Sequence, residues 1–501
     1  MGQGSTSSTI GRICIRSAAL LQVLRLTANV FSHIPPVQLE RRLALNRWVV
    51  MSIGIAGASS TTSLWVVAIE TLHLIARFCA AQSNSISHPY NSHSISVLSR
   101  LSRRYTQLDS LFYAVQAAVF AVCIARIHKR ARFEIRAFSA AVARFYPSAV
   151  SRVVPSPTLS SRPSLQAHFQ AIIGWFATPW WNVEHIKDIT YATPEEILAS
   201  GGPKIIPRLQ LDILRKKNSH HNRPILIYIH GGAWLFGDKR LRTLPICHYF
   251  ASTENWVVLN INYRMAPAFR LEDMLVDIKR AIRWARSNNH VHGGDSRFIA
   301  ISGGSAGGHL CSLAALTANW PQFQPGFEDT DTTVQACLPW YPAVGHVYAS
   351  AAWKRWFLEA IVQMKPRESL VRYDMGTDEW CDPMAVIHRM STQERIARVP
   401  PFFVIEGTFD NIVEPRLVRA FVSELCKETK LPVGYLEVPG AHHAFDLSFS
   451  PKLIYALWAA GNAMETLYNT WLALNGSNQT ILGTATFPNS AQTEEQIVVT
   501  D

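Results

Sequence analysis

The sequence lacks several features that would assign it to a class at once. Its eight cysteines form no Cys-x-x-Cys pair and no zinc-like cluster with histidine, so neither a structural zinc site nor a disulfide framework is predicted. Basic residues are not interleaved with aromatic ones as in RNA-binding proteins, and we find no internal repeat. We therefore expect no nucleic-acid partner.

Acidic residues are scarce in the first third of the chain. Residues 1–160 contain 17 of the 48 Lys and Arg residues but only 4 of the 36 Asp and Glu residues, a net charge of +13. The remaining residues are close to neutral, with a net charge of −1. A basic segment that is also rich in Ser, Leu and Ala is more typical of regions that flank a membrane than of nucleic-acid binders.

Two long runs in this basic third lack charge. Residues 48–69 are about long enough to cross a bilayer, and a shorter uncharged run at 111–125 lies within a second possible span at about 111–127. Basic residues precede the first run and follow the second, so the positive-inside rule favours a hairpin with both ends in the cytoplasm. We therefore predict membrane association with the rest of the chain on the cytoplasmic side, and the sequence does not indicate which membrane. The alternative is a soluble helical cap.

Composition divides the chain into segments. Residues 1–146 form the basic, apolar helical region, and 147–165 have the Pro- and Ser-rich composition of a linker. Residues 166–474 are expected to fold as the catalytic domain, independently of residues 1–150, with a possible cap insertion at 346–392. The polar tail covers 475–501. The sequence leaves open acylation of Gly2 or Cys14 and glycosylation of Asn475 or Asn478.

Strand and helix patterns alternate through the catalytic domain. Alternation of this kind predicts an α/β fold, with a mostly parallel eight-stranded sheet flanked by helices. We expect strands at 183–191, 209–214, 224–230, 256–263, 298–302, 334–340, 401–406 and 433–438, and helices at 241–251, 271–288, 418–429 and 452–472.

A Gly-x-Ser-x-Gly motif stands between an expected strand and an expected helix. Gly303 and Gly307 flank Ser305, and the strand–turn–helix context is the one in which a nucleophilic serine is presented on a sharp turn. The glycines would remove side chains that collide in such a turn. The alternative is a glycine-rich turn that binds phosphate or has no function.

A second glycine pair follows the strand that ends at His230. Acyl transfer needs N–H donors aimed at the oxygen that becomes negatively charged. Gly231 and Gly232 could supply such donors, together with the N–H of Ala306 directly after the serine. Alone, the pair could be an ordinary turn, but the serine motif some 70 residues later favours an oxyanion hole.

An acid and a base should follow later strands. Asp410 follows the strand at 401–406, with Glu406 as a rival too near the end of the strand. His442 and His443 follow the last strand, and chemistry alone does not choose between them. The order Ser, Asp, His is the one found in α/β hydrolases.

Six motifs of this region occur together in one known family. They are His230–Trp234, Asn262–Pro267, Gly293–Asp295, Gly303–Gly308, Gln324–Asp329 and Pro439–Asp446. Together they resemble the hormone-sensitive-lipase-like branch of the α/β-hydrolase superfamily, and most closely membrane-anchored bacterial esterases and lipases. The resemblance covers about residues 180–470. It implies that His443 is the base, Asp410 the acid, and Gly231 and Gly232 part of the oxyanion hole.

The predicted function is that of a serine hydrolase that cleaves carboxylic esters through a Ser305–His443–Asp410 triad and an acyl-enzyme. The expected substrate is a small-molecule or lipid ester, and neither a cofactor nor a metal ion is needed. One alternative is an amide hydrolase of the arylformamidase type. Another is a non-catalytic ligand receptor, although such proteins usually lose a triad residue. The oligomeric state is not predicted.

Overall fold

The computed structural model describes nine segments of the chain. They are residues 122, 125–147, 182–218, 222–240, 244–288, 292–345, 380–388, 398–447 and 450–475. The uncharged run at 48–69, most of the run at 111–127, nearly all of the linker at 147–165 and of the tail from 475, and most of the insertion at 346–392 lie outside these residues.

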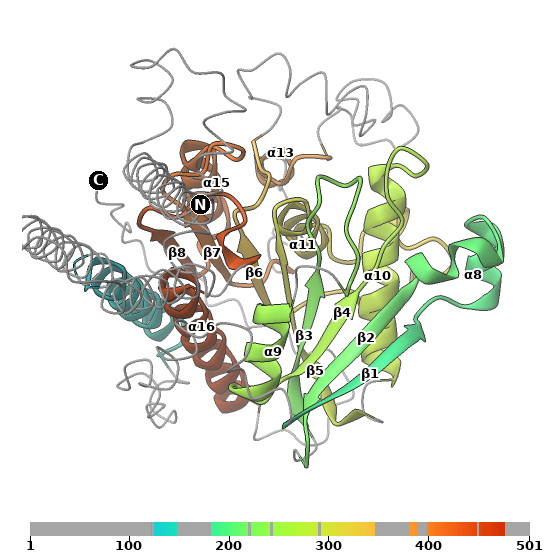
Figure 1. The fold of residues 1–501 in the computed structure, drawn as a ribbon, viewed down its shortest axis with the longest axis horizontal. Coiled ribbons are helices and arrows are strands. Elements are labelled where there is room, and N and C mark those ends of the chain that lie inside the picture. The colour runs from blue at the N-terminus through green and yellow to red at the C-terminus, as the bar shows by residue number, and fades with distance from the viewer. Residues whose placement is uncertain are drawn as a thin grey trace, which may run out of the picture.

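Eight strands form one sheet in the order β1-β2-β4-β3-β5-β6-β7-β8 (Figure 1). The β1–β2 and β2–β4 pairs are antiparallel, and all the other pairs are parallel. This arrangement confirms the mostly parallel eight-stranded sheet and fits an α/β-hydrolase fold. The strands are β1 (Val183–Thr190), β2 (Gln210–Lys216), β3 (Arg223–Ile229), β4 (Val257–Ile261), β5 (Gly294–Gly304), β6 (Ala336–Trp340), β7 (Phe402–Gly407) and β8 (Val433–Val438).

Helices cover both faces of the sheet, which explains why the central strands are nearly continuous apolar runs. On one face lie α10 (Leu271–Asn288), α11 (Ala306–Leu316), α13 (Pro383–His388) and α15 (Pro415–Thr429). On the other face lie α9 (Leu244–Ser252) and α16 (Pro451–Asn475).

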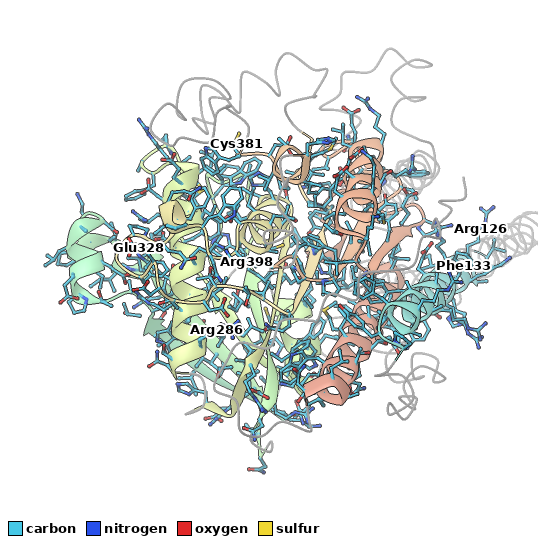
Figure 2. The ribbon with its side chains drawn as sticks, turned by 180° about the vertical axis from the view of Figure 1, so that it is seen from behind. Arg126, Phe133, Arg286, Glu328, Cys381 and Arg398 are labelled. Carbon is cyan, nitrogen blue, oxygen red and sulfur yellow. The ribbon has the colours of Figure 1, made fainter. Side chains whose placement is uncertain are left out.

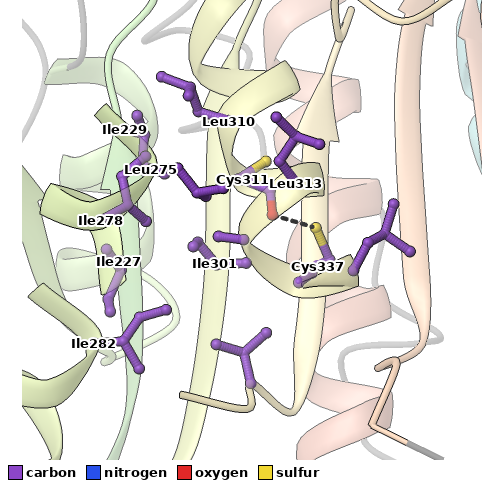
Figure 3. Packing of buried hydrophobic residues seen from close by; sticks show 14 of the residues in the cluster. Ile227, Ile229, Leu275, Ile278, Ile282, Ile301, Leu310, Cys311, Leu313 and Cys337 are labelled. Carbon is purple, nitrogen blue, oxygen red and sulfur yellow. Dashed lines mark hydrogen bonds between the residues drawn. The ribbon is translucent and has the colours of Figure 1, made fainter. Parts of the chain in front are cut away.

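Helix α11 is held in the middle of the first face (Figure 3). Its Leu310 and Leu313 belong to the core cluster that also contains side chains of β3, β5 and α10. The Cys311 carbonyl accepts a 3.7 Å hydrogen bond from Cys337 Sγ on β6. The residue in front of α11 is therefore attached to one of the most deeply buried helices of the described chain.

Short elements were not expected from the sequence. The helix α8 (Pro194–Ala199) begins with a capping box, in which the Thr193 hydroxyl and the Glu196 carboxylate each accept a backbone N–H bond. Its single turn has no apolar periodicity, so pattern analysis passes over it. The 3₁₀ turn η4 (Pro203–Arg208) was missed for the same reason.

One helix of the basic N-terminal region packs on the catalytic domain. Residues at helical spacing, from Ile127 to Tyr146, join the core formed with α16 and the sheet. Phe138 lies edge-on to Phe403 of β7, with 5.2 Å between ring centroids. His128 stacks on Trp458 of α16 at 5.8 Å. The expected boundary at residue 146 thus does not separate this helix from the core it shares.

The opposite side of this helix is basic. Arg126, Lys129, Arg136 and Arg144 are exposed, and so is Phe133, at 57% (Figure 2). Among the described helices, none combines the length and the apolar character needed to span a bilayer.

Candidate active site

Ser305 occupies a strained turn between β5 and α11. Its φ of 58° and ψ of −118° lie outside the conformations that a non-glycine residue ordinarily adopts. Its N–H donates to the Trp340 carbonyl of β6 at 3.0 Å, which ties the turn to the neighbouring strand. Strain at a residue held this firmly is typical of a functional position.

The glycines of the motif allow this turn to form. A Cβ atom on Gly303 would lie 2.5 Å from the Gly307 carbonyl carbon and 2.7 Å from the Ile229 carbonyl oxygen. Gly307 approaches the same strand end even more closely. The strand and the helix can therefore meet only if both positions lack side chains, as the sequence predicted.

His443 brings Ser305 and Asp410 into one chain of hydrogen bonds. Its Nε2 lies 2.9 Å from Ser305 Oγ, and its Nδ1 lies 2.6 Å from Asp410 Oδ2. The other carboxylate oxygen of Asp410 accepts the N–H groups of Ile412 and Val413, each at 2.8 Å. These two bonds fix the carboxylate so that Oδ2 faces the imidazole.

The two rival residues take other positions. His442 is buried, and its ring lies edge-on to Phe409 at 5.8 Å between centroids. Glu406 is buried within β7, where its Oε1 accepts the Gly407 N–H at 2.7 Å. Burial, reinforced by the charge of Asp410, raises the pKa of Glu406 well above its usual value. Of these residues, the structure joins only Asp410 and His443 to the serine.

Gly231 and Ala306, two of the expected oxyanion-hole residues, lie next to Ser305, and Gly232 follows Gly231 in the same loop. A Cβ on Gly231 would lie 3.4 Å from the Cβ of Ser305, so this glycine directly faces the serine. Gly232 has a φ of 130°, which bends the loop sharply. Ala306 is the first residue of α11, and a helix leaves its first N–H groups without intrahelical partners.

A polar network around the buried side chains of Lys239 and Asp212 holds the loop after Gly232. The Lys239 ammonium donates to Asp212 at 2.5 Å and to Asp188 at 2.6 Å, and the Lys239 N–H donates to Asn262 Oδ1 at 2.6 Å. We call Lys239, Asp212, Asp188 and Asn262 the loop clamp. Burial acts to raise the pKa of Asp212, but hydrogen bonds from His185 and Lys239 outweigh this effect and lower the pKa to about 2.

Sequence analysis assigned no role to the clamp. Its only signal was the Asn262–Pro267 motif, which carried the resemblance without showing what Asn262 contacts. The four residues come from four separate parts of the chain, and only the sheet brings them together. Among the described residues, no group of three or more His, Cys, Asp and Glu side chains is arranged to hold a metal ion.

A family model described as BD-FAE matches residues 211–425. The chain is 39% identical over 250 residues to the "Probable carboxylic ester hydrolase LipM" of Mycobacterium tuberculosis, covering 49% of this chain and 55% of LipM. It is 36% identical over 264 residues to the "Esterase LipQ" of the same organism, and the match covers 52% of this chain and 59% of LipQ. The chain thus spans little more than half the length of these relatives.

Among solved structures, esterase B of Lactobacillus rhamnosis, inhibited by a tributyrin phosphonate, matches with a TM-score of 0.48 at 19% identity. The match covers 60% of this chain and 90% of that one. The fold assignment does not depend on this match. It rests on the sheet order, the serine turn and the two mycobacterial relatives. The described residues between 183 and 475 therefore have an α/β-hydrolase fold and are similar in sequence to named mycobacterial ester hydrolases.

Proposed function

We propose that the protein hydrolyses carboxylic esters through an acyl-enzyme on Ser305. The observation that carries this proposal is the continuous chain from Ser305 Oγ through His443 to Asp410, with separations of 2.9 and 2.6 Å. It is supported by the names of LipM and LipQ, which describe ester hydrolysis. The substrate class we propose is a small-molecule or lipid ester.

The roles follow from the geometry. His443 Nε2 removes the proton of Ser305 as Oγ bonds to the ester carbonyl carbon, and Asp410 stabilises the imidazolium that forms. The N–H groups of Gly231, Gly232 and Ala306 bind the oxyanion. As the C–O bond to the alcohol breaks, His443 gives its proton to the leaving alkoxide. Water then attacks the acyl-enzyme with the same histidine as base, releasing the acid and restoring Ser305.

The same residues could hydrolyse an amide, and the substrate decides between the two reactions. We expect a series of p-nitrophenyl acyl esters to be turned over with a higher kcat/KM than formanilide, an aryl formamide. The series would also give the preferred acyl chain length. Faster turnover of the formamide would replace the proposal by the arylformamidase reaction. Absence of turnover and of covalent labelling at Ser305 would favour a ligand receptor.

We also propose that the N-terminal region attaches the enzyme to a membrane. The support is the uncharged run at 48–69 and the basic exposed side of the helix at 125–147. Basic side chains next to an apolar segment are attracted by anionic lipid headgroups, and the exposed ring of Phe133 could enter the headgroup layer.

A further inference from the structure

Tyr341 lies against the catalytic histidine. It follows β6 directly, and its ring is edge-on to His443, with 4.8 Å between centroids and 61° between planes. Only 3% of Tyr341 is exposed. The tyrosine thus packs on the imidazole through a ring contact that is separate from the hydrogen bonds to Asp410 and Ser305.

Tyr341 is held in place from three sides. Its N–H donates to the Ile405 carbonyl at 2.6 Å, and its hydroxyl donates to Asp446 Oδ1. A Cβ on Gly304 would lie 2.7 Å from the tyrosine oxygen, so this position before Ser305 has to lack a side chain. The φ of Tyr341 is +34°, a strained value for this residue type. A buried tyrosine with a strained backbone conformation is typical of a position that contributes to function.

Asp446 is a second buried carboxylate close to the triad. It lies three residues after His443, in the short turn η9 (Phe445–Leu447), and 1% of it is exposed. Burial raises its pKa to about 6, while the Tyr341 hydroxyl, a backbone N–H and the charge of His443 act in the opposite direction. The hydroxyl donor and the charge of His443 thus favour the ionised form of this buried group.

The groups that face this pair set the local charge balance. His443 meets Ser305, Asp410 and Tyr341, and Asp446 meets Tyr341. Tyr228 and Tyr341 are both buried, which raises their pKa values far above the neutral range and keeps them uncharged. Burial, reinforced by the charge of Asp410, also raises the pKa of Glu406 well above its usual value. Of the groups named, His443 is thus the only one that becomes positively charged, when it takes the proton of Ser305.

We propose that Tyr341 and Asp446 position His443 through a contact separate from its two hydrogen bonds and favour its protonated form when Ser305 attacks. The tyrosine ring restricts the imidazole, and the carboxylate, oriented by the tyrosine hydroxyl, stabilises the charge. Both are positioning residues, because neither touches substrate. The proposal rests on the proposed function, in which His443 is the general base.

The test compares three variants of the full chain. Tyr341→Phe keeps the ring and removes the hydroxyl, and Asp446→Asn removes the charge. The matched control is Tyr435→Phe, because the Tyr435 hydroxyl also donates to a carboxylate, that of Glu437, at 2.7 Å on β8. For each protein, kcat and KM for an aryl ester and the rate of Ser305 labelling by an aryl phosphonate are measured from pH 5 to 9, together with the melting temperature.

The sign of the expected shift is fixed. A nearby carboxylate raises the pKa of a histidine, so its removal lets His443 lose its proton at lower pH. In Asp446→Asn, the acid limb of the pH profiles of kcat/KM and of the labelling rate should move to lower pH by about half a unit. It should move in the same direction in Tyr341→Phe, because the carboxylate without its donor holds a proton more tightly. In both, kcat should fall several-fold with KM little changed, whereas Tyr435→Phe should match wild type.

Either folded variant whose acid limb stays at the wild-type pH would overturn the proposal, even if its activity or melting temperature fell. If Asp446→Asn does not fold, Tyr341→Phe decides alone, because it is the smaller change. A wild-type chain that the phosphonate does not label at any pH would overturn the proposed function, and this inference with it. If wild type is labelled but the folded variants keep the acid limb of the wild-type pH profile, only this inference is overturned.

Discussion

The Nε2 atom of His443 lies 2.9 Å from the Oγ atom of Ser305, although 138 residues separate them in the chain. The serine follows the carboxyl end of β5, and the histidine and Asp410 follow the carboxyl ends of β8 and β7. In a parallel sheet these ends lie at one edge, which is where ligands of open α/β sheets bind. The sheet order therefore creates the site.

Replacement of the two adjacent histidines should have very different consequences. His443→Ala should reduce kcat on an aryl ester by a factor on the order of 10⁴ or more, because triad residues act as a unit. His442→Ala should be much milder, since the His442 ring packs on Phe409. Steady-state kinetics of both variants, with melting curves as a control, make the comparison. If His442→Ala were the inactive variant, the assignment of the base would be wrong.

The loop clamp should contribute to both stability and catalysis. Lys239→Met leaves the buried Asp212 carboxylate without its cation, which should lower the free energy of unfolding by roughly 3 kcal/mol. Because the clamp holds the oxyanion loop, kcat should also fall. The matched control is Arg240→Met, whose exposed side chain pairs with Asp188 at the surface and should contribute little. Denaturant unfolding and ester kinetics measure the two effects.

The clamp also predicts a pH dependence. The pKa of Asp212 is lowered in the folded protein to about 2, so its contribution is complete above the unfolded value near 4 and is lost as the pH falls toward 2. The stability difference between wild type and Lys239→Met should therefore be constant from pH 7 to 5 and shrink below pH 4. A difference that grew on acidification would contradict the clamp.

Truncation should show what the N-terminal helix contributes. A shortened chain that begins at residue 160 keeps the triad and should hydrolyse short esters. It should melt at a lower temperature than one that begins at residue 122, because loss of the helix uncovers Trp458 and Phe403. Melting curves and size-exclusion chromatography of both chains test this. Equal melting temperatures would mean that the helix contributes no stability to the domain.

Membrane attachment should depend on the basic face of that helix. The full chain should remain with membranes after carbonate extraction. The chain from residue 122 should bind phosphatidylserine vesicles but not phosphatidylcholine vesicles, and less strongly in high salt. Arg126→Glu combined with Arg136→Glu should weaken this binding. The control pair is Arg297→Glu with Arg416→Glu, which are exposed elsewhere. Equal loss in both pairs would contradict a localised surface.

Local sequence patterns were enough for the sheet and for the residues around the serine. The strands at 224–230 and 298–302 are apolar runs ended by glycine, and glycines at 303 and 307 are required by contacts below 3 Å. The element bounds differ by a few residues, with β5 beginning at Gly294 rather than 298. Propensity cannot fix such ends, since the neighbouring strand decides where pairing stops.

The parts that the sequence did not predict depend on long-range packing. Lys239 contacts Asp212 and Asp188 from a loop, and Tyr341 reaches Asp446 across 105 residues. Each of these residues is a common type with no local motif that indicates a buried partner. The helix at 125–147 is similar, because its basic composition suggested a membrane segment, while its apolar stripe packs on α16.

The nucleophile gives the most direct test. Wild type and Ser305→Ala are incubated with an aryl phosphonate and analysed by intact mass, and the same samples are assayed on a p-nitrophenyl ester. The account predicts one adduct and ester turnover for wild type, and neither for Ser305→Ala, with unchanged melting. A Ser305→Ala protein that kept more than a few per cent of the turnover, or that still formed the adduct, would contradict it.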